Sequence, residues 1–215
     1  MIEACVSLSE ACTTIAVGTD DDDPGRRAYG RVLWPAVIAG CVRHFTGTRR
    51  TLSGWTNLLA EGGIAEGYRA LASLGDDHLP RTQGWDRLLL EALDKLGGEG
   101  IAYGNDLHQG EALPTAPVIS AGIVEALGWM MEPGLKHMHV DDVWRDLGRG
   151  AGCLAYVPEV VIEHQHPDAG KAVGDETYTE SAAGMSADRD AYHRWRDERM
   201  ASDVAKVRAL RERAP

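Results

Sequence analysis

Asp76, Asp77 and His78 are three consecutive side chains that can each bind a metal ion. They follow the segment 69–74, whose apolar pattern predicts a strand. Neighbouring carboxylates repel each other unless a cation neutralises them. Carboxylate oxygens with one imidazole nitrogen suit Mg²⁺ or Mn²⁺, and Mn²⁺ tolerates nitrogen better. The alternative is capping of the helix predicted from Trp85, but the two acids lie too early to cap it.

A histidine pair, His164 and His166, closes the extended segment 154–163. Side chains two residues apart in a strand point to the same side, so both imidazoles can face one site. Single histidines are more often satisfied core or surface residues. The pair at a strand end nevertheless favours metal ligation, and the pattern does not decide which of the two histidines is the ligand.

Four aspartates, Asp20, Asp21, Asp22 and Asp23, follow a predicted buried strand at 13–18. Such a run most often forms a solvated turn. Its place at a strand end also allows a functional interpretation, because a carboxylate there can accept hydrogen bonds from a nucleobase or from ribose hydroxyls.

Asp141 and Asp142 open a predicted helix, just after His137 and His139. Acids at this position commonly cap a helix and complement its dipole. The functional interpretation is a general base held at a helix start and aimed into a cleft.

These clusters need elements that carry them to one edge of a sheet. Strands alternating with helices predict an α/β domain with a mostly parallel sheet, in which ligands bind beyond the carboxyl ends of the strands. We expect a domain over 1–185 and a charged C-terminal helix, 186–215, packed on it through Tyr192, Trp195, Val204 and Val207. The expected helices are 2–9, 57–68, 85–96, 119–127, 141–147 and 187–213, and the expected strands are 13–18, 42–45, 69–74, 100–103 and 154–163, the last broken at Pro158.

Composition narrows the classes of function. The chain has 215 residues and a net charge of −11, which argues against a general nucleic-acid binder. Its four cysteines form no CxxC pair and predict reduced, mostly buried thiols in a cytoplasmic protein. No apolar run is long enough to span a bilayer, and the first residues lack the features of a signal peptide. The sequence contains no GxSxG, Walker-type or HExxH motif.

The order of the motifs is more informative than any one of them. Along the chain, the motifs come in this order: a strand with DDD, Asn57 before a helix, a strand with GDDH, then HVDDVW and IEHQHP. This order resembles nucleotide-sugar glycosyltransferases of the GT-A fold, particularly the inverting family-two-like enzymes of actinobacteria and their phages. The resemblance covers residues 11–178. It implies a mostly parallel central sheet flanked by helices, with a C-terminal helix.

The resemblance also implies roles for matching residues. It assigns the base and ribose of a nucleotide-diphosphate sugar to the acid cluster and Asn57. It assigns the ribose and a Mn²⁺ or Mg²⁺ ion to the GDDH motif, and completion of the metal or phosphate site to a late histidine. Asp142 would be the base, with Asp141 beside it. By residue, the implied nucleotide-sugar ligands are Asp20, Asp21, Asp22, Asn57 and Asp76, and the implied metal ligands are Asp76, Asp77, His78, His164 and His166.

Two departures from the family pattern matter. His78 stands where a third acid often occurs, and the chain starts at what looks like the first helix, without the strand that usually precedes it. We therefore expect the sheet edge beside 13–18 to be open, filled by a partner or covered by the N-terminal helix. The acceptor, whether glycan, protein or small molecule, is not indicated. The alternatives are a metal-dependent phosphohydrolase and a non-catalytic nucleotide-binding remnant of the same fold.

Overall fold

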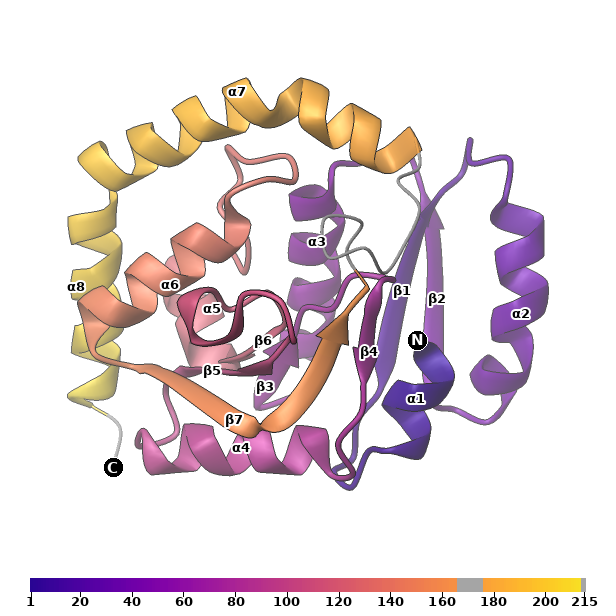
Figure 1. Cartoon of the computed structure of the whole chain (residues 1–215), viewed down its shortest axis with the longest axis horizontal. Coiled ribbons are helices and arrows are strands. Elements are labelled where there is room, and N and C mark those ends of the chain that lie inside the picture. Colours follow the sequence, from indigo (N-terminus) through magenta and orange to yellow (C-terminus); the bar gives the residue numbers. More distant parts are fainter. Residues whose placement is uncertain (166–175, 214–215) are drawn as a thin grey trace.

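The computed structural model describes residues 1–165 and 176–213, and only the backbone of 176–183. Its main sheet has five strands in the order β3-β6-β5-β7-β4, and β1 and β2 form a separate parallel pair (Figure 1). The strands are β1 Ile15–Asp20, β2 Val42–Gly47, β3 Ala70–Ala72, β4 His78–Pro80, β5 Ile101–Asn105, β6 Pro117–Ser120 and β7 Leu154–His164.

The α/β class is confirmed, but the expectation of a mostly parallel sheet is wrong. Within the main sheet only β5 and β7 run parallel, whereas β3–β6, β5–β6 and β4–β7 are antiparallel. The difference arises from β6 and β4, two short strands that the sequence analysis did not predict. β6 was assigned to the start of a helix from Ile119, because periodicity does not separate a four-residue apolar strand from a buried helix segment. The helix α5 begins only at Ala121.

The main sheet is covered on both faces because its strands are apolar on both. In β5, Ile101 packs into one core cluster and its neighbour Ala102 into another. Successive strand residues point to opposite faces, so the two clusters mark the two sides of the sheet. The helices are α1 Ile2–Ser7, α2 Arg26–Ile38, α3 Leu52–Ala65, α4 Trp85–Lys95, α5 Ala121–Leu127, α6 Val140–Ala151, α7 Glu176–Glu198 and α8 Met200–Arg211, with a short 3₁₀ turn η1 at Gly110–Ala112.

Helix α4 covers one face, as its amphipathic pattern predicted. Trp85, Leu89 and Leu93 are buried against the sheet. Asp86 faces the N-terminal segment and accepts hydrogen bonds from the hydroxyl of Ser9, the hydroxyl of Thr13 and the N–H groups of Glu10 and Ala11. This buried carboxylate ties the residues that lead into β1 to α4.

Helices α5, α6, α7 and α8 cover the opposite face, with α7 running along one side of the molecule (Figure 1). Tyr192, Trp195, Val204 and Val207 are buried there, as expected. The predicted single helix 187–213 is instead two helices that meet at Arg199. Within the described residues, none of the helices has the length and apolar character needed to cross a bilayer.

Strand β7 is continuous through Pro158, where a break between two strands was expected. Pairing with β5 shifts register between Gly104 and Asn105, so that Asn105 pairs with Val161. A side chain at Gly104 would collide with the carbonyl oxygen of Val160. Proline is tolerated here because the bulge removes a ladder position, and glycine permits the close approach of the two backbones.

The parallel pair β1–β2 stands at one end of the molecule and carries α2 on its outer side (Figure 1). The sequence analysis did not predict α2, which contains Pro35. Among the described residues β1 pairs only with β2, and the residues before Thr13 include the helix α1 but no strand. The hydroxyl of Tyr68, just before β3, donates to the hydroxyl of Thr14, just before β1, at 2.6 Å.

Candidate functional site

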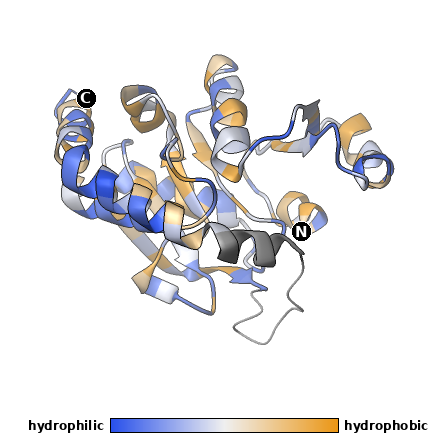
Figure 2. Cartoon of the chain, turned by 90° about the horizontal axis from the view of Figure 1, so that it is seen from above, coloured by the Kyte–Doolittle hydropathy of each residue, from blue (hydrophilic) through white to orange (hydrophobic). Residues whose placement is uncertain are grey.

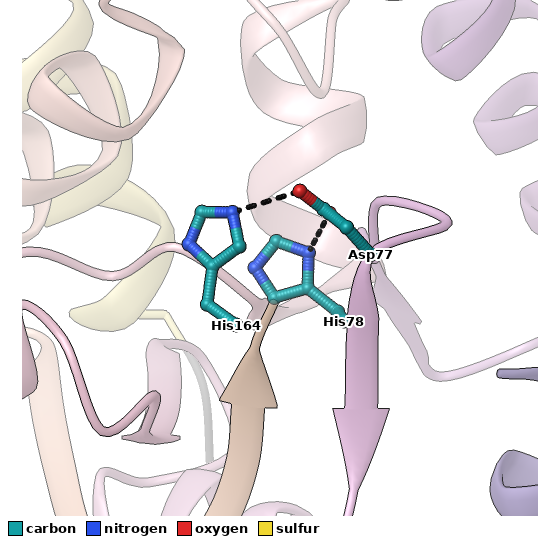
Figure 3. A group of neighbouring side chains, drawn as sticks. All are labelled: Asp77, His78 and His164. Atoms are coloured by element: carbon teal, nitrogen blue, oxygen red, sulfur yellow. Dashed lines mark hydrogen bonds and ion pairs between the residues drawn. The ribbon is translucent and has the colours of Figure 1, made fainter. Parts of the chain in front are cut away.

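His78 and His164 lie directly opposite each other in the antiparallel pair β4–β7. Their imidazole rings stack with centroids 4.2 Å apart and planes inclined by 20°. Figure 3 shows both rings beside the carboxylate of Asp77. One ligand atom from each of the three residues lies within 4.8 Å of the other two. The sheet thus gathers Asp77, His78 and His164 from two distant parts of the sequence, as the sequence analysis expected.

Nδ1 of His78 has two possible hydrogen-bond partners. The N–H of Gly75 donates to Nδ1 at 3.0 Å, while Oδ1 of Asp77 lies 3.2 Å from the same nitrogen. His78 is only 5% exposed, and its Nε2 is buried without a hydrogen-bond partner among the described residues. If the ring hydrogen moves to Nδ1 and points at Asp77, Nε2 is left with a lone pair for an ion, in the usual carboxylate–histidine–metal arrangement.

Gly75 holds this arrangement in a tight turn between β3 and β4. The N–H of His78 donates to the carbonyl of Gly75 at 3.1 Å, which closes the turn. A methyl group at Gly75 would lie about 2.5 Å from Oδ1 of Asp77 and 2.9 Å from Nδ1 of His78. A side chain at this position would therefore force Asp77 and His78 to move from their present positions.

Asp106 and His108 adjoin the cluster and were not predicted. Asp106 is 2% exposed, and its Oδ2 lies 4.0 Å from Nδ1 of His164. The ring of His108 stands edge-on to that of His164, with centroids 6.3 Å apart. Burial alone would raise the pKa of Asp106. The carboxylate accepts hydrogen bonds from the N–H groups of Gly110, His108 and Gln109 and from the hydroxyl of Thr115, and these lower the pKa below its ordinary value. The signal in the sequence was a polar pair, Asn105-Asp106, at the end of the strand.

The remaining expected metal ligands are placed differently. Asp76 is exposed and lies outside the three-residue group. His166 lies outside the described residues. The cluster itself therefore supplies one carboxylate and two imidazoles, a set that suits Mn²⁺ better than Mg²⁺.

The acid cluster at the end of β1 is only partly available to a ligand, because Asp20 makes hydrogen bonds within the protein. Oδ1 of Asp20 accepts from the indole N–H of Trp55 at 2.7 Å and from the N–H of Arg50 at 3.1 Å. Asp22 is exposed and pairs with Arg49 at 3.0 Å. Asp21 is exposed. Asp20 thus helps to fix the start of α3, while Asp21 and Asp22 lie at the surface.

Asn57, expected to bind the nucleotide, makes structural contacts. Its Oδ1 accepts from the N–H groups of Met130 and Met131, and its Nδ2 donates to the carbonyl of Met131, all at 2.8 Å. Ser53 on the same helix donates to the carbonyl of Leu135. The two side chains fasten α3 to the loop 130–136, which leads to the start of α6.

Asp141 and Asp142 differ sharply in their surroundings. Asp142 is held by Arg145, whose Nη1 donates to Oδ1 at 2.6 Å, and by His139, whose Nδ1 lies 2.8 Å from Oδ2. Burial and the neighbouring charge of Asp142 raise the pKa of Asp141. The Asp141 carboxylate accepts a hydrogen bond from the N–H of Asp142, at 3.2 Å.

His137 lies shortly before α6 and is affected by the charge of the acids beside His78. Burial lowers its pKa, and the negative charges of Asp188, Asp77 and Asp76 oppose that shift. Asp188 on α7 accepts hydrogen bonds from the N–H groups of Lys136, His137 and Met138, which fixes the segment that leads into α6. Asp76 and Asp77, in the turn between β3 and β4, therefore lie within electrostatic reach of His137.

A comparison with known protein families finds none that matches the chain, and a comparison with curated proteins finds no similar sequence. The functional argument therefore depends on the geometry of the site.

Proposed function

We propose that this chain is a glycosyltransferase that moves a sugar from a nucleotide-diphosphate donor to a hydroxyl acceptor in the cytoplasm, with a divalent metal ion. The observation that carries the proposal is the group Asp77, His78 and His164, with the buried and unpartnered Nε2 of His78. A buried imidazole nitrogen left without a hydrogen-bond partner is costly unless a ligand occupies it.

The donor set favours Mn²⁺ over Mg²⁺ in this proposal. Mg²⁺ strongly prefers oxygen ligands in a regular octahedron, whereas Mn²⁺ accepts imidazole. A bound divalent ion would neutralise the charge that builds on the diphosphate leaving group. Asp77 would contribute the anionic ligand and also orient the ring of His78.

The base of the reaction is assigned to the Asp141–Asp142 pair, and the geometry favours Asp141. The pattern-based expectation was Asp142, but both oxygens of that carboxylate contact Arg145 or His139. A carboxylate with a raised pKa is the better proton acceptor near neutral pH. Asp141 would take the proton of the acceptor hydroxyl while that oxygen attacks the anomeric carbon and the bond to the diphosphate breaks. Asp142 would act as a positioning residue.

A thermal-shift experiment tests the proposal. Nucleoside diphosphates and their sugars should raise the unfolding temperature more with Mn²⁺ than with a chelator, because ligand binding to the folded state adds to its stability. Equal stabilisation under both conditions would contradict the metal-coupled site.

Product analysis separates the transferase from a metal-dependent hydrolase with the same ligands. A transferase should release nucleoside diphosphate slowly until an acceptor is added. A hydrolase should release sugar or phosphate at full rate without one. Nucleotide binding with no turnover under either condition would indicate a non-catalytic protein.

A further inference from the structure

The outer side of α2 carries an unusual combination of arginines and large apolar side chains. Arg27, Arg31, Trp34 and Ile38 recur at intervals of four, three and four residues, so they form one stripe along the helix. Trp34 is 61% exposed and Ile38 68% exposed. Val32 and Tyr29, at 78% and 45%, extend the apolar surface around the helix. Leu33, in contrast, is buried on the inner side.

Charge is distributed unevenly between this region and the rest of the chain. Residues 20–50 contain six arginines and four aspartates, whereas the whole chain has a net charge of −11. Helix α2 itself contains three arginines and no acidic residue. Asp22 is paired with Arg49, and Asp23 accepts from the N–H of Gly25 at 2.6 Å. The arginines of α2 therefore form a local positive surface on an acidic protein.

The arginines flank a shallow hollow of about 430 Å³ lined by Arg27, Gly30, Arg31 and Trp34. Guanidinium groups bind phosphate oxygens in a bidentate manner, and indole rings favour the boundary between water and lipid. A hollow with two guanidinium groups and an indole matches the chemistry of an anionic phospholipid headgroup above the start of its acyl chains.

We infer that α2 is a membrane-docking helix that lies on an anionic phospholipid surface through the stripe Arg27, Arg31, Trp34 and Ile38. Interfacial helices combine basic residues with Trp and aliphatic residues, and here both kinds lie on the exposed side of α2, where the arginines can reach the headgroups and Trp34 and Ile38 the acyl boundary. The inference is independent of the proposed transferase activity.

The position of α2 favours lipid over a protein partner. The helix stands at one end of the molecule, outside β2, and its outer surface mixes hydrophobic and hydrophilic residues (Figure 2). A protein partner would have to offer both acidic groups for the arginines and an apolar surface for Trp34 and Ile38. A lipid surface offers both, because its anionic headgroups complement the arginines and the start of its acyl chains accepts the apolar side chains.

Flotation with lipid vesicles tests the inference on the full chain. Binding is expected to vesicles of phosphatidylcholine that contain phosphatidylglycerol, to be absent with phosphatidylcholine alone, and to weaken at high salt. The variant Arg27→Gln/Arg31→Gln should bind at least about tenfold more weakly, since each arginine near an anionic leaflet contributes about fivefold. Trp34→Ala/Ile38→Ala should lose binding to a comparable extent.

A matched variant on α7, Arg189→Gln/Arg194→Gln, removes two exposed arginines from a different helix and should bind as the parent does. Trp34 is the most exposed of the six tryptophans. Vesicles should therefore protect it from acrylamide quenching, an effect absent in Trp34→Phe.

Three results would overturn the inference. The first is equal binding to neutral and anionic vesicles, and the second is an equal loss in the α7 control. The third is no binding to anionic vesicles. If the protein then self-associates with rising concentration and Trp34→Ala abolishes this, the stripe is a contact between two copies of the chain.

Discussion

His78 and His164 occupy facing positions of the β4–β7 pair, and their rings stack 4.2 Å apart. A cross-strand pair is positioned by the backbone ladder, so these two imidazoles meet without relying on a flexible loop. Asp77 joins them from the adjacent turn, with Oδ2 3.1 Å from Nε2 of His164. The site is therefore organised by the sheet before any ligand binds.

The first prediction separates the two neighbouring acids of the GDDH motif. Asp77→Asn should remove the stabilisation that Mn²⁺ provides, whereas Asp76→Asn, at an exposed position outside the cluster, should retain it. At a Mn²⁺ concentration about 100 times its dissociation constant, the parent protein should gain about 2.7 kcal/mol in the free energy of unfolding. Differential scanning fluorimetry with MnCl₂ and with EDTA measures the effect. Equal loss in both variants would mean that the ion is not held by this cluster.

The second prediction concerns Gly75. Gly75→Ala should weaken Mn²⁺ binding because the new methyl group collides with the side chains of Asp77 and His78. Gly62→Ala on α3 is the matched control, since its methyl group would meet nothing within 4 Å and alanine favours a helix. Isothermal titration with MnCl₂ should show a loss for the first variant only. Unchanged affinity in Gly75→Ala would show that the turn does not set the ligand geometry.

Much of the fold was predictable from patterns in the sequence, and the predictions that failed have identifiable causes. The period of Trp85, Leu89 and Leu93 predicted α4 because a long apolar stripe repeats over three turns. Strands β4 and β6 were missed because three or four residues are too short to show a period. Helix α2 was missed because its exposed apolar residues blur the contrast between its two sides.

Site residues were predictable where side chains that can bind a metal stand at the end of a predicted strand. Asp77, His78 and His164 were named from their residue types and their places at strand ends, and they meet in the structure. Asp106 was missed because a single aspartate after a strand has no distinctive spacing. The hydrogen bonds of Asn57 to Met130 and Met131 were not foreseen, because sequence does not reveal which backbone groups a polar side chain will meet.

The third prediction tests the structural role of Asn57. Asn57→Ala should lower the free energy of unfolding by about 1–3 kcal/mol, because the N–H groups of Met130 and Met131 lose their acceptor. Nucleotide affinity, measured at a temperature where the variant is folded, should stay within about twofold of the parent protein. A large loss of affinity with unchanged stability would restore the nucleotide-binding role.

The last prediction distinguishes Asp141 from Asp142. The folded-state pKa of Asp141 is raised, so ionising this carboxylate costs folding free energy. That cost is absent below the ordinary carboxyl pKa of about 3.9 and fully present once the pH exceeds the raised value. Asp141→Asn should therefore stabilise the protein at neutral pH, with a gain that disappears in acid, while turnover falls by about 10² to 10⁴.

Asp142→Asn should behave in the opposite way in the same assays. It breaks the charge-assisted bond from Arg145 and should cost about 1–3 kcal/mol in stability at neutral pH. Turnover should fall less than in Asp141→Asn, because Asp142 positions the helix start and does not accept the proton. Thermal unfolding across the acid-to-neutral range, together with initial rates at saturating donor, measures both quantities. If Asp142→Asn abolishes turnover and Asp141→Asn does not, the base is Asp142. If both variants turn over normally and differ only in stability, the two acids serve the start of α6 alone.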